Sequence, residues 1–178
     1  MTPPMTPPMA RSFDEANLYL ELQPCVVCGR VALDQQPGVA GGQLDGEPVS
    51  WLDTVCANCG NRARFAFRMP AEPPVSTPGH VVFGGDEPSQ LIDPGQWLKL
   101  ADVVTRGPEV RDRVDLAASA VTEVLKFIKD GEDRVPGYEF WTDSGRQLLD
   151  EARWRFTRES LEFELDRYRR MLAVLDEG

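Results

Sequence analysis

The sequence feature that most constrains this fold is a pair of short cysteine motifs, CVVCG at residues 25–29 and CANCG at residues 56–60. Together they hold all four cysteines of the 178-residue chain. Two residues between the cysteines of a pair let the chain turn back, so that both sulfurs face one ion. The glycine after each pair accepts the positive φ of a tight turn and leaves backbone N–H groups free to bond the thiolates. The sequence therefore predicts one metal site with the ligands Cys25, Cys28, Cys56 and Cys59.

The identity and role of the ion follow in part from this ligand set. Four thiolates in a tetrahedron suit Zn²⁺, and a complete set of four leaves no open position for catalysis, which predicts a structural zinc. An iron site of the rubredoxin type uses the same four ligands, so zinc and iron both stay open. A pair of redox motifs would need a βαβ setting with a helix after each motif, whereas the flanks here are typical of strands and turns.

The order of these motifs resembles the zinc-ribbon family over about residues 23–69: Cys-x-x-Cys-Gly, a hairpin, Cys-x-x-Cys-Gly and an aromatic strand. The resemblance implies a structural zinc on the same four cysteines. Zinc ribbons serve transcription factors, ribosomal proteins, enzymes and adaptors, so the resemblance fixes no function. The whole layout, with FGGDEPSQLIDPGQWL and acidic helices after the ribbon, also looks like small zinc-ribbon proteins of high-GC actinobacteria, a likeness to which no activity attaches.

The fold class that we predict is α+β, a small β zinc ribbon followed by an α-helical bundle. The proline repeat MTPPMTPP blocks helix and sheet ladders, and its two methionines, Met1 and Met5, together with Met9 directly after it, leave the true start open. PAEPPVSTPG reads as a stiff linker. The predicted parts are a disordered proline-rich tail (1–11), the zinc ribbon (12–69), the linker (70–79) and a helical domain (80–178).

Capping and periodicity signals predict the individual elements. Ser12 and Glu15 have capping-box spacing and favour a helix from Phe13 to about Leu20, although the alternation in residues 18–22 fits a strand nearly as well. We expect a short strand at residues 80–83. Asp93-Pro94 is typical of a helix start. Further helices are expected over about 108–129, 142–156 and 157–176, the last two as separate helices or as one bent helix.

The net charge of −10 repels nucleic acid and anionic membranes, so such partners would need a local basic patch. The best patch is the predicted strand RARFAFRM at residues 62–69, with phenylalanines on one face and arginines on the other. This strand gives an alternative function, a nucleic-acid-binding zinc ribbon. The same arginines would also balance the negative charge of a zinc tetrathiolate. The candidate contacts are Arg30, Arg62, Arg64 and Arg68.

The loop FGGDEPSQLIDPGQW at residues 83–97 is the densest polar segment, and it has two interpretations. It is a candidate surface for a protein partner, since loops carry function more often than cores. It is equally a structured turn with Asp93 as a helix cap. The candidate partner residues are Asp86, Glu87, Gln90, Asp93 and Trp97.

The function that we predict is a non-catalytic zinc-binding protein that acts as a protein-interaction module, of the adaptor or the immunity and antitoxin type. No phosphate loop, dinucleotide fingerprint or nucleophile elbow is present. A second alternative is an enzyme with a purely structural zinc and a site in the 80–97 loop, built from His80, Asp86, Glu87 and Asp93. Without an apolar run of about 18 residues or a signal-peptide stretch, we expect a cytoplasmic protein with no membrane partner.

Overall fold

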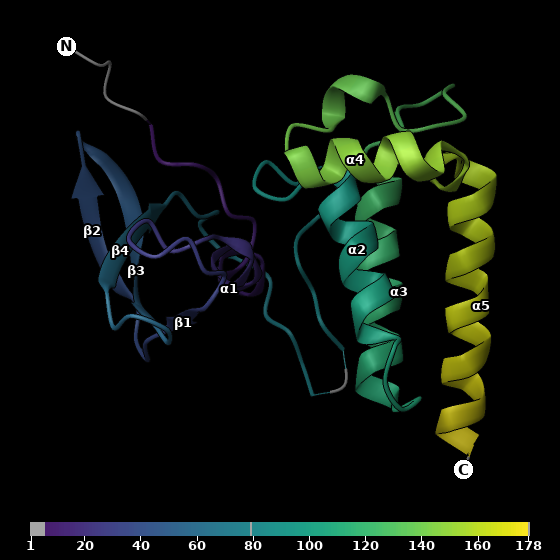
Figure 1. Cartoon of the computed structure of the whole chain (residues 1–178), viewed down its shortest axis with the longest axis horizontal. Coiled ribbons are helices and arrows are strands. Elements are labelled where there is room, and N and C mark those ends of the chain that lie inside the picture. Colours follow the sequence, from purple (N-terminus) through teal and green to yellow (C-terminus); the bar gives the residue numbers. More distant parts are fainter. Residues whose placement is uncertain (1–5, 79, 178) are drawn as a thin grey trace. The chain divides into compact units, whose positions relative to one another are not determined.

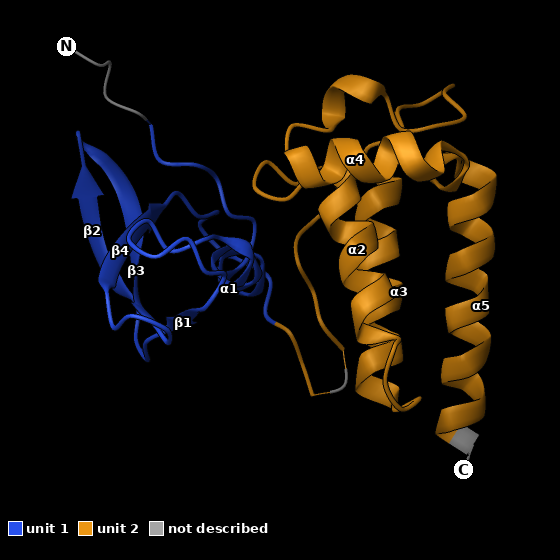
Figure 2. Ribbon diagram, viewed as in Figure 1, with its two compact units in different colours: residues 1–75 blue, residues 76–178 orange. Residues whose placement is uncertain are grey.

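The structure is a computed structural model that describes residues 6–78 and 80–177. Two of the candidate start residues, Met1 and Met5, lie outside this range. The chain forms two compact units, residues 1–75 and 76–178 (Figure 2), and the boundary falls inside the predicted linker at 70–79. The strands lie in the first unit and most of the helices in the second, which confirms the α+β prediction.

The first unit is built on one antiparallel sheet of four strands, namely β1 (Leu33–Gln35), β2 (Ala40–Leu44), β3 (Glu47–Cys56) and β4 (Arg62–Phe67) (Figure 1). The long strand β3 is central. β1 and β2 pair with different parts of one of its edges, and β4 pairs with the other edge. Asp45 and Gly46 join β2 to β3 with φ of 52° and 86°. These positive angles are what a two-residue hairpin turn with the right twist requires.

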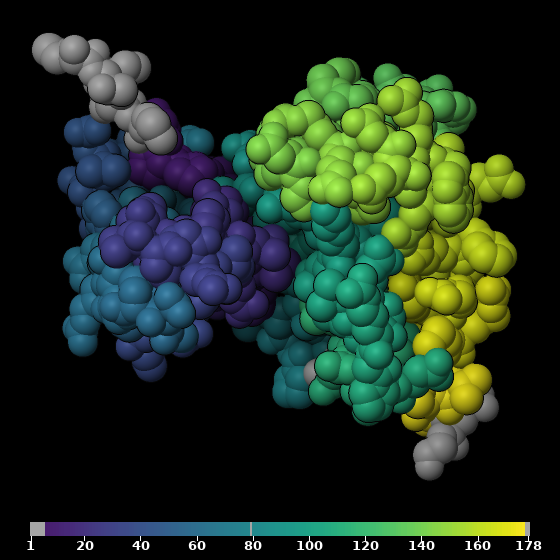
Figure 3. Space-filling model, in the orientation of Figure 1, coloured from purple at the N-terminus to yellow at the C-terminus, as the bar shows by residue number. Residues whose placement is uncertain are grey.

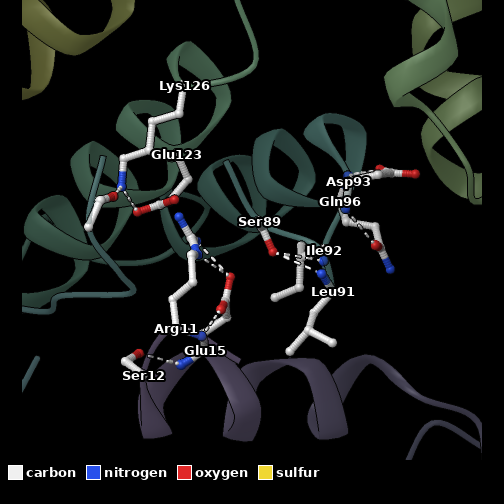
Figure 4. Close-up of polar contacts among 11 residues, drawn as sticks. Arg11, Ser12, Glu15, Ser89, Leu91, Ile92, Asp93, Gln96, Glu123 and Lys126 are labelled. Carbon is white, nitrogen blue, oxygen red and sulfur yellow. Dashed lines mark hydrogen bonds and ion pairs between the residues drawn. The ribbon is translucent and has the colours of Figure 1, made fainter. Parts of the chain in front are cut away.

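Helix α1 (Phe13–Leu22) packs on this sheet, so the helical interpretation of residues 13–22 is correct and the strand is not. The Ser12 hydroxyl accepts a hydrogen bond from the Glu15 N–H at 3.0 Å and caps the helix (Figure 4). The Glu15 carboxylate accepts from the backbone N–H of Arg11 at 2.7 Å and from its guanidinium. The Tyr19 ring meets Phe67 of β4 edge to face, with 5.9 Å between the ring centroids.

Residues 6–11 differ from the predicted disordered tail, because they lie against the end of β4. Met9 forms an isolated parallel bridge with Arg68. The Ala10 N–H donates to the Arg68 carbonyl and the Arg68 N–H donates to the Pro8 carbonyl, both at 3.0 Å. Proline lacks an N–H but keeps its carbonyl, so a proline-rich segment can still pair with a sheet edge at isolated positions.

The second unit is a helical bundle of α2 (Pro94–Val104), α3 (Arg111–Leu125), α4 (Asp143–Ala152) and α5 (Arg158–Glu177). Helix α3 packs between α2 and α5, and α4 lies across the ends of the other helices (Figures 1 and 3). Two short 3-10 turns, η1 (Gly137–Glu139) and η2 (Arg153–Phe156), flank α4. One apolar face of each of α2, α3 and α5 contributes to the core, with Trp97, Ala101, Val114, Ala117, Val121, Leu161, Leu165 and Tyr168 buried.

The structure decides between two predicted alternatives in this unit and corrects two other predicted elements. Residues 142–176 form two separate helices and not one bent helix, because η2 and the extended residue Thr157 separate α4 from α5. The predicted helix 108–129 is shorter, since Val110 is extended at its start. Residues 80–83 form no strand: the Val81 N–H donates to the Asp115 carboxylate at 3.0 Å and the Val82 N–H to the Ser76 hydroxyl at 2.8 Å. Side chains thus satisfy the backbone groups that a sheet would have paired.

Candidate metal centre

The two cysteine motifs fold into turns with the same hydrogen-bond pattern. In the first turn, the Gly29 N–H donates to the Cys25 carbonyl at 2.8 Å. In the second turn, the Gly60 N–H donates to the Cys56 carbonyl at the same distance. The φ angles of the two glycines are 69° and 72°, in the left-handed region that favours glycine. The turn geometry expected from CxxCG is therefore present twice.

The sheet brings the two turns together at one end. The first turn leads into β1, and the second joins the end of β3 to the start of β4. Antiparallel pairing of β1 with β3 places Leu33 opposite Cys56, and the Ala57 N–H donates to the Ala32 carbonyl at 2.8 Å. Cys25, Leu33 and Cys56 are buried together, with Phe65 packed against them. The register of β1 on β3 therefore sets how close the two pairs of sulfurs come.

The four sulfurs have the spacing of a tetrahedral metal site. Cys25 Sγ lies 3.7 Å from Cys59 Sγ, and Cys28 Sγ lies 3.6 Å from Cys56 Sγ, so each close pair joins the two turns. All four sulfurs lie within 4.8 Å of one another, and none is in a disulfide. Zinc–sulfur bonds of about 2.3 Å at tetrahedral angles place sulfurs about 3.8 Å apart. The donor set and its spacing thus fit Zn²⁺, as predicted for these residues.

Backbone groups of the turns favour thiolates at the first pair. The N–H groups of Cys28 and Val27 lower the pKa of Cys25. The Arg30 N–H, with help from the Asn58 side chain, lowers the pKa of Cys28 to about 6. The Asn61 N–H lowers the pKa of Cys59, but desolvation and the neighbouring sulfurs outweigh it and raise that pKa to about 12. Four thiolates so close together need a cation, and a divalent metal would supply that charge.

The chemistry available to such a centre is structural. Four cysteine ligands complete the coordination of a tetrahedral ion, whereas catalytic zinc sites keep one position for water or substrate. Within residues 6–78 and 80–177, this is the only group of three or more Cys, His, Asp or Glu side chains that satisfies the geometry of a metal site.

In the strand predicted to bind nucleic acid, exposed arginines still alternate with less exposed residues, but an ion pair within the sheet neutralises one of the arginines. Arg62 and Arg64 are exposed on β4, while Phe67 is buried. Arg64 lies opposite Asp53 on β3 and donates to its carboxylate at 2.6 and 2.8 Å, which lowers the pKa of Asp53 and raises that of Arg64. Arg68 donates to the Pro7 carbonyl at 2.8 Å. Of the four candidate arginines, Arg30 and Arg62 are also exposed. Nucleic-acid binding by this strand stays a prediction.

The predicted partner loop divides into buried and exposed members. Asp93 and Trp97 are both 0% exposed, so neither side chain is available to a partner in this structure. Asp93 caps α2 by accepting from the Gln96 N–H at 2.9 Å, and the Gln96 side chain accepts from the Asp93 N–H (Figure 4). The interpretation of Asp93 as a helix cap is therefore the correct one. Asp86, Glu87 and Gln90 are exposed, as a contact surface requires.

The residues of the predicted enzyme site lie in several different surroundings. His80 Nδ1 lies 3.3 Å from Asp115 Oδ1 and lines a hollow of about 310 Å³ between the 80–84 segment and α3. Glu87 and Gln90 border a different hollow, of about 650 Å³, together with Trp141. Asp93 is buried as a cap. A catalytic role for the 80–97 loop stays a prediction.

The sequence reasoning missed two exposed aromatic residues, Trp154 in η2 and Phe163 near the start of α5. A signal for Phe163 was present, because it lies two positions after Leu161 and so falls on the face of the helix opposite the Leu161–Leu165 stripe.

Comparisons with protein-family models, with curated proteins and with solved structures find no match to this chain. The zinc-ribbon resemblance therefore rests on the four cysteines and their geometry. Within the described residues, no helix combines the length and apolar character needed to cross a membrane.

Proposed function

We propose that this chain is a non-catalytic protein-interaction module, of the adaptor or the immunity type, whose first unit folds around one structural Zn²⁺. The observation that carries the proposal is the closed cluster of four cysteine sulfurs, 3.6 and 3.7 Å apart in its two close pairs. An ion held by four thiolates stabilises the turns that surround it and offers no position to a substrate.

The first cysteine turn supports a role in interaction, because it presents apolar side chains to solvent. Val26 and Val27 stand between two of the ligands and are 88% and 67% exposed, and Val31 follows at 60%. Neighbouring exposed apolar residues on a folded surface mark sites of contact with partners. The ion would hold these valines in place, which reduces the entropy that is lost when a partner binds.

The experiment is affinity capture from a native lysate with the full, zinc-loaded chain, with captured proteins quantified by mass spectrometry. We expect one partner at near-stoichiometric yield, reduced by Val26→Ser combined with Val27→Ser. Ala57→Ser alters the corresponding exposed position of the second turn and serves as the matched control. Absence of a stoichiometric partner, together with clear turnover in a screen of hydrolase and transferase substrates, would contradict the proposal.

A further inference from the structure

Two large aromatic side chains of the second unit are exposed to solvent and line the same hollow. Trp154 on η2 and Phe163 on α5 are each 69% exposed, and both line one hollow of about 560 Å³. Trp97, in the core of the same unit, is fully buried. Exposed tryptophan and phenylalanine are costly to keep in water, and tryptophan is among the residues that contribute most to protein interfaces.

The packing of their neighbours forces these two rings outward. In η2, Phe156 turns inward against Phe140, with 4.8 Å between the ring centroids. Arg155 also turns inward and donates to both Asp102 carboxylate oxygens at 2.8 Å. Trp154 is thereby left on the outer side of the turn. On α5, the buried stripe of Leu161 and Leu165 places Phe163 on the outer face.

A second hollow, of about 930 Å³, continues from the first and shares Phe163 and Glu159 with it. In this second hollow, carboxylates outnumber the guanidinium of Arg158, whereas the first hollow is also lined by the guanidiniums of Arg155 and Arg167. The carboxylates come from the loop after α3 and from the first turns of α5, and their side chains are exposed. They are Asp130, Glu132, Asp133, Glu159, Glu162 and Asp166. We call the two hollows together the aromatic–acidic groove.

Backbone hydrogen bonds fix the two segments that form this groove. The Val135 N–H donates to the Phe156 carbonyl at 2.9 Å, and the Arg158 N–H donates to the Asp133 carbonyl at 2.7 Å. Arg134 and Thr157 form an antiparallel bridge between these bonds. A surface already held by such bonds loses little conformational freedom when a ligand binds.

We propose that the aromatic–acidic groove docks a positively charged segment of a partner protein. Asp133 and Asp166 already pair with Arg134 and Arg169 of the chain itself. Lysine or arginine side chains of the partner segment therefore lie against Asp130, Glu132, Glu159 and Glu162, and an apolar side chain lies between Trp154 and Phe163. The inference rests on the proposed interaction function and names the site and the chemistry of the partner. Charge complementarity selects this occupant: a second copy would bring the same carboxylates face to face, and nucleic acid would be repelled.

The test begins with a random peptide library displayed on phage. Peptides are selected on the full zinc-loaded chain and counter-selected on the same chain with Trp154→Ala and Phe163→Ala. We expect the enriched peptides to combine several lysines or arginines with an aromatic or aliphatic residue. Enrichment of acidic or neutral peptides, or no enrichment over the counter-selection, would overturn the proposal.

The best peptide is then measured by fluorescence polarisation against single variants. Phe163→Ala should weaken binding at least about tenfold, whereas Val174→Ala, at an equally exposed apolar position of α5, should leave it unchanged. Glu159→Gln with Glu162→Gln should weaken binding about three- to tenfold and flatten its salt dependence. Glu21→Gln, at an exposed position of α1 in the first unit, is the matched charge control. Equal effects of the groove and control variants would also contradict the proposal.

Capture experiments separate failure of this inference from failure of the proposed function. A stoichiometric cellular partner whose capture is unaffected by the Trp154→Ala and Phe163→Ala double variant would overturn the groove as the docking site and leave the interaction function standing. Loss of that capture, with Val174→Ala retaining it, would support both.

Discussion

At the scale of single residues, the starts of α2 and α4 approach each other closely in the second unit. A Cβ at Gly95 would overlap the Cα of Gly145, and a Cβ at Gly145 would overlap the Asp93 carboxylate. Asp93 accepts hydrogen bonds from the N–H of Thr142 at 2.8 Å and from its hydroxyl at 2.6 Å. One buried carboxylate therefore caps α2 and also anchors the residue before α4.

The first prediction concerns Gly145→Ala. The added methyl group would push on a carboxylate that is held from both helices, so we expect the free energy of unfolding to fall by about 2–3 kcal/mol. Urea denaturation followed by circular dichroism measures this change. Gly137→Ala is the control, because a Cβ there meets open space. A loss for Gly145→Ala no larger than the loss for Gly137→Ala would contradict the packing described.

The second prediction compares two residues of the 83–97 loop, the helix cap Asp93 and the exposed candidate contact residue Asp86. Asp93→Ala removes the helix cap and leaves the Thr142 N–H and hydroxyl without their acceptor, so we expect a loss of about 2–3 kcal/mol in unfolding free energy. Asp86→Ala, at an exposed position of the same loop, should change it by less than about 0.5 kcal/mol. Similar stability of the two variants in urea denaturation would show that Asp93 is not the anchor.

At the scale of elements, a partly buried ion pair ties η2 to α2. The Arg155 guanidinium bonds both oxygens of Asp102 and lies 3.4 Å from Glu164 on α5. These carboxylates, Asp102 first, raise the pKa of Arg155, so the guanidinium stays charged throughout the accessible pH range. The pair fixes the position of the short turn that separates α4 from α5 and carries Trp154.

The third prediction is a coupling energy between Arg155 and Asp102. Because the geometry is bidentate and only partly exposed, a double-mutant cycle with Arg155→Ala and Asp102→Ala should give a coupling of about 1–2 kcal/mol in unfolding free energy. The exposed pair Arg64–Asp53 is the comparison, where partly screened charges should give less. Strictly additive single effects for Arg155 and Asp102 would show that the contact does not form in solution.

The sequence predicted helix starts and turns well where the conformation depends on a single proline or glycine. Pro94 after Asp93 predicted the start of α2, and the glycine in each CxxCG predicted the positive φ found at residues 29 and 60. The sequence left open whether α4 and α5 are separate helices or one bent helix, because η2 depends on where Phe156 and Arg155 find partners far along the chain. Residues 80–83 likewise look like a strand, but side chains of residues 76 and 115 take its N–H groups.

The candidate metal site was also predictable from local sequence signals. Four cysteines with fixed spacing carry their own chemistry, so they could be named as candidate ligands without knowledge of the sheet, and the structure brings their sulfurs together. The exposed contact surfaces could not be predicted in the same way, because the exposure of a side chain depends on tertiary packing. Trp97 in the predicted partner loop is buried, whereas Trp154 is exposed to solvent.

At the scale of the whole molecule, the two units differ in what stabilises them. The first unit has a small sheet with the cluster of four cysteine sulfurs at one end. The second is a helical bundle with a continuous apolar core. Small turn-rich units depend on an ion for stability, whereas helical bundles of this size do not.

The fourth prediction follows from this difference. Removing the metal with a chelator should unfold the cysteine end of the first unit and leave the bundle folded. Hydrogen exchange measured by mass spectrometry should show loss of protection over residues 25–69 and continued protection in α2, α3 and α5. Cys56→Ser should have the same effect as the chelator. Unchanged protection around the cysteines after metal removal would mean that the ion is not structural.

The central claim, a closed structural zinc site, is tested most directly by the metal content of the full chain purified without added metal or chelator. Elemental analysis by mass spectrometry, combined with titration of reactive thiols, should give about one Zn²⁺ per chain and thiols that react only after the metal is removed. A natively purified chain with no bound metal and four freely titratable thiols would contradict the account.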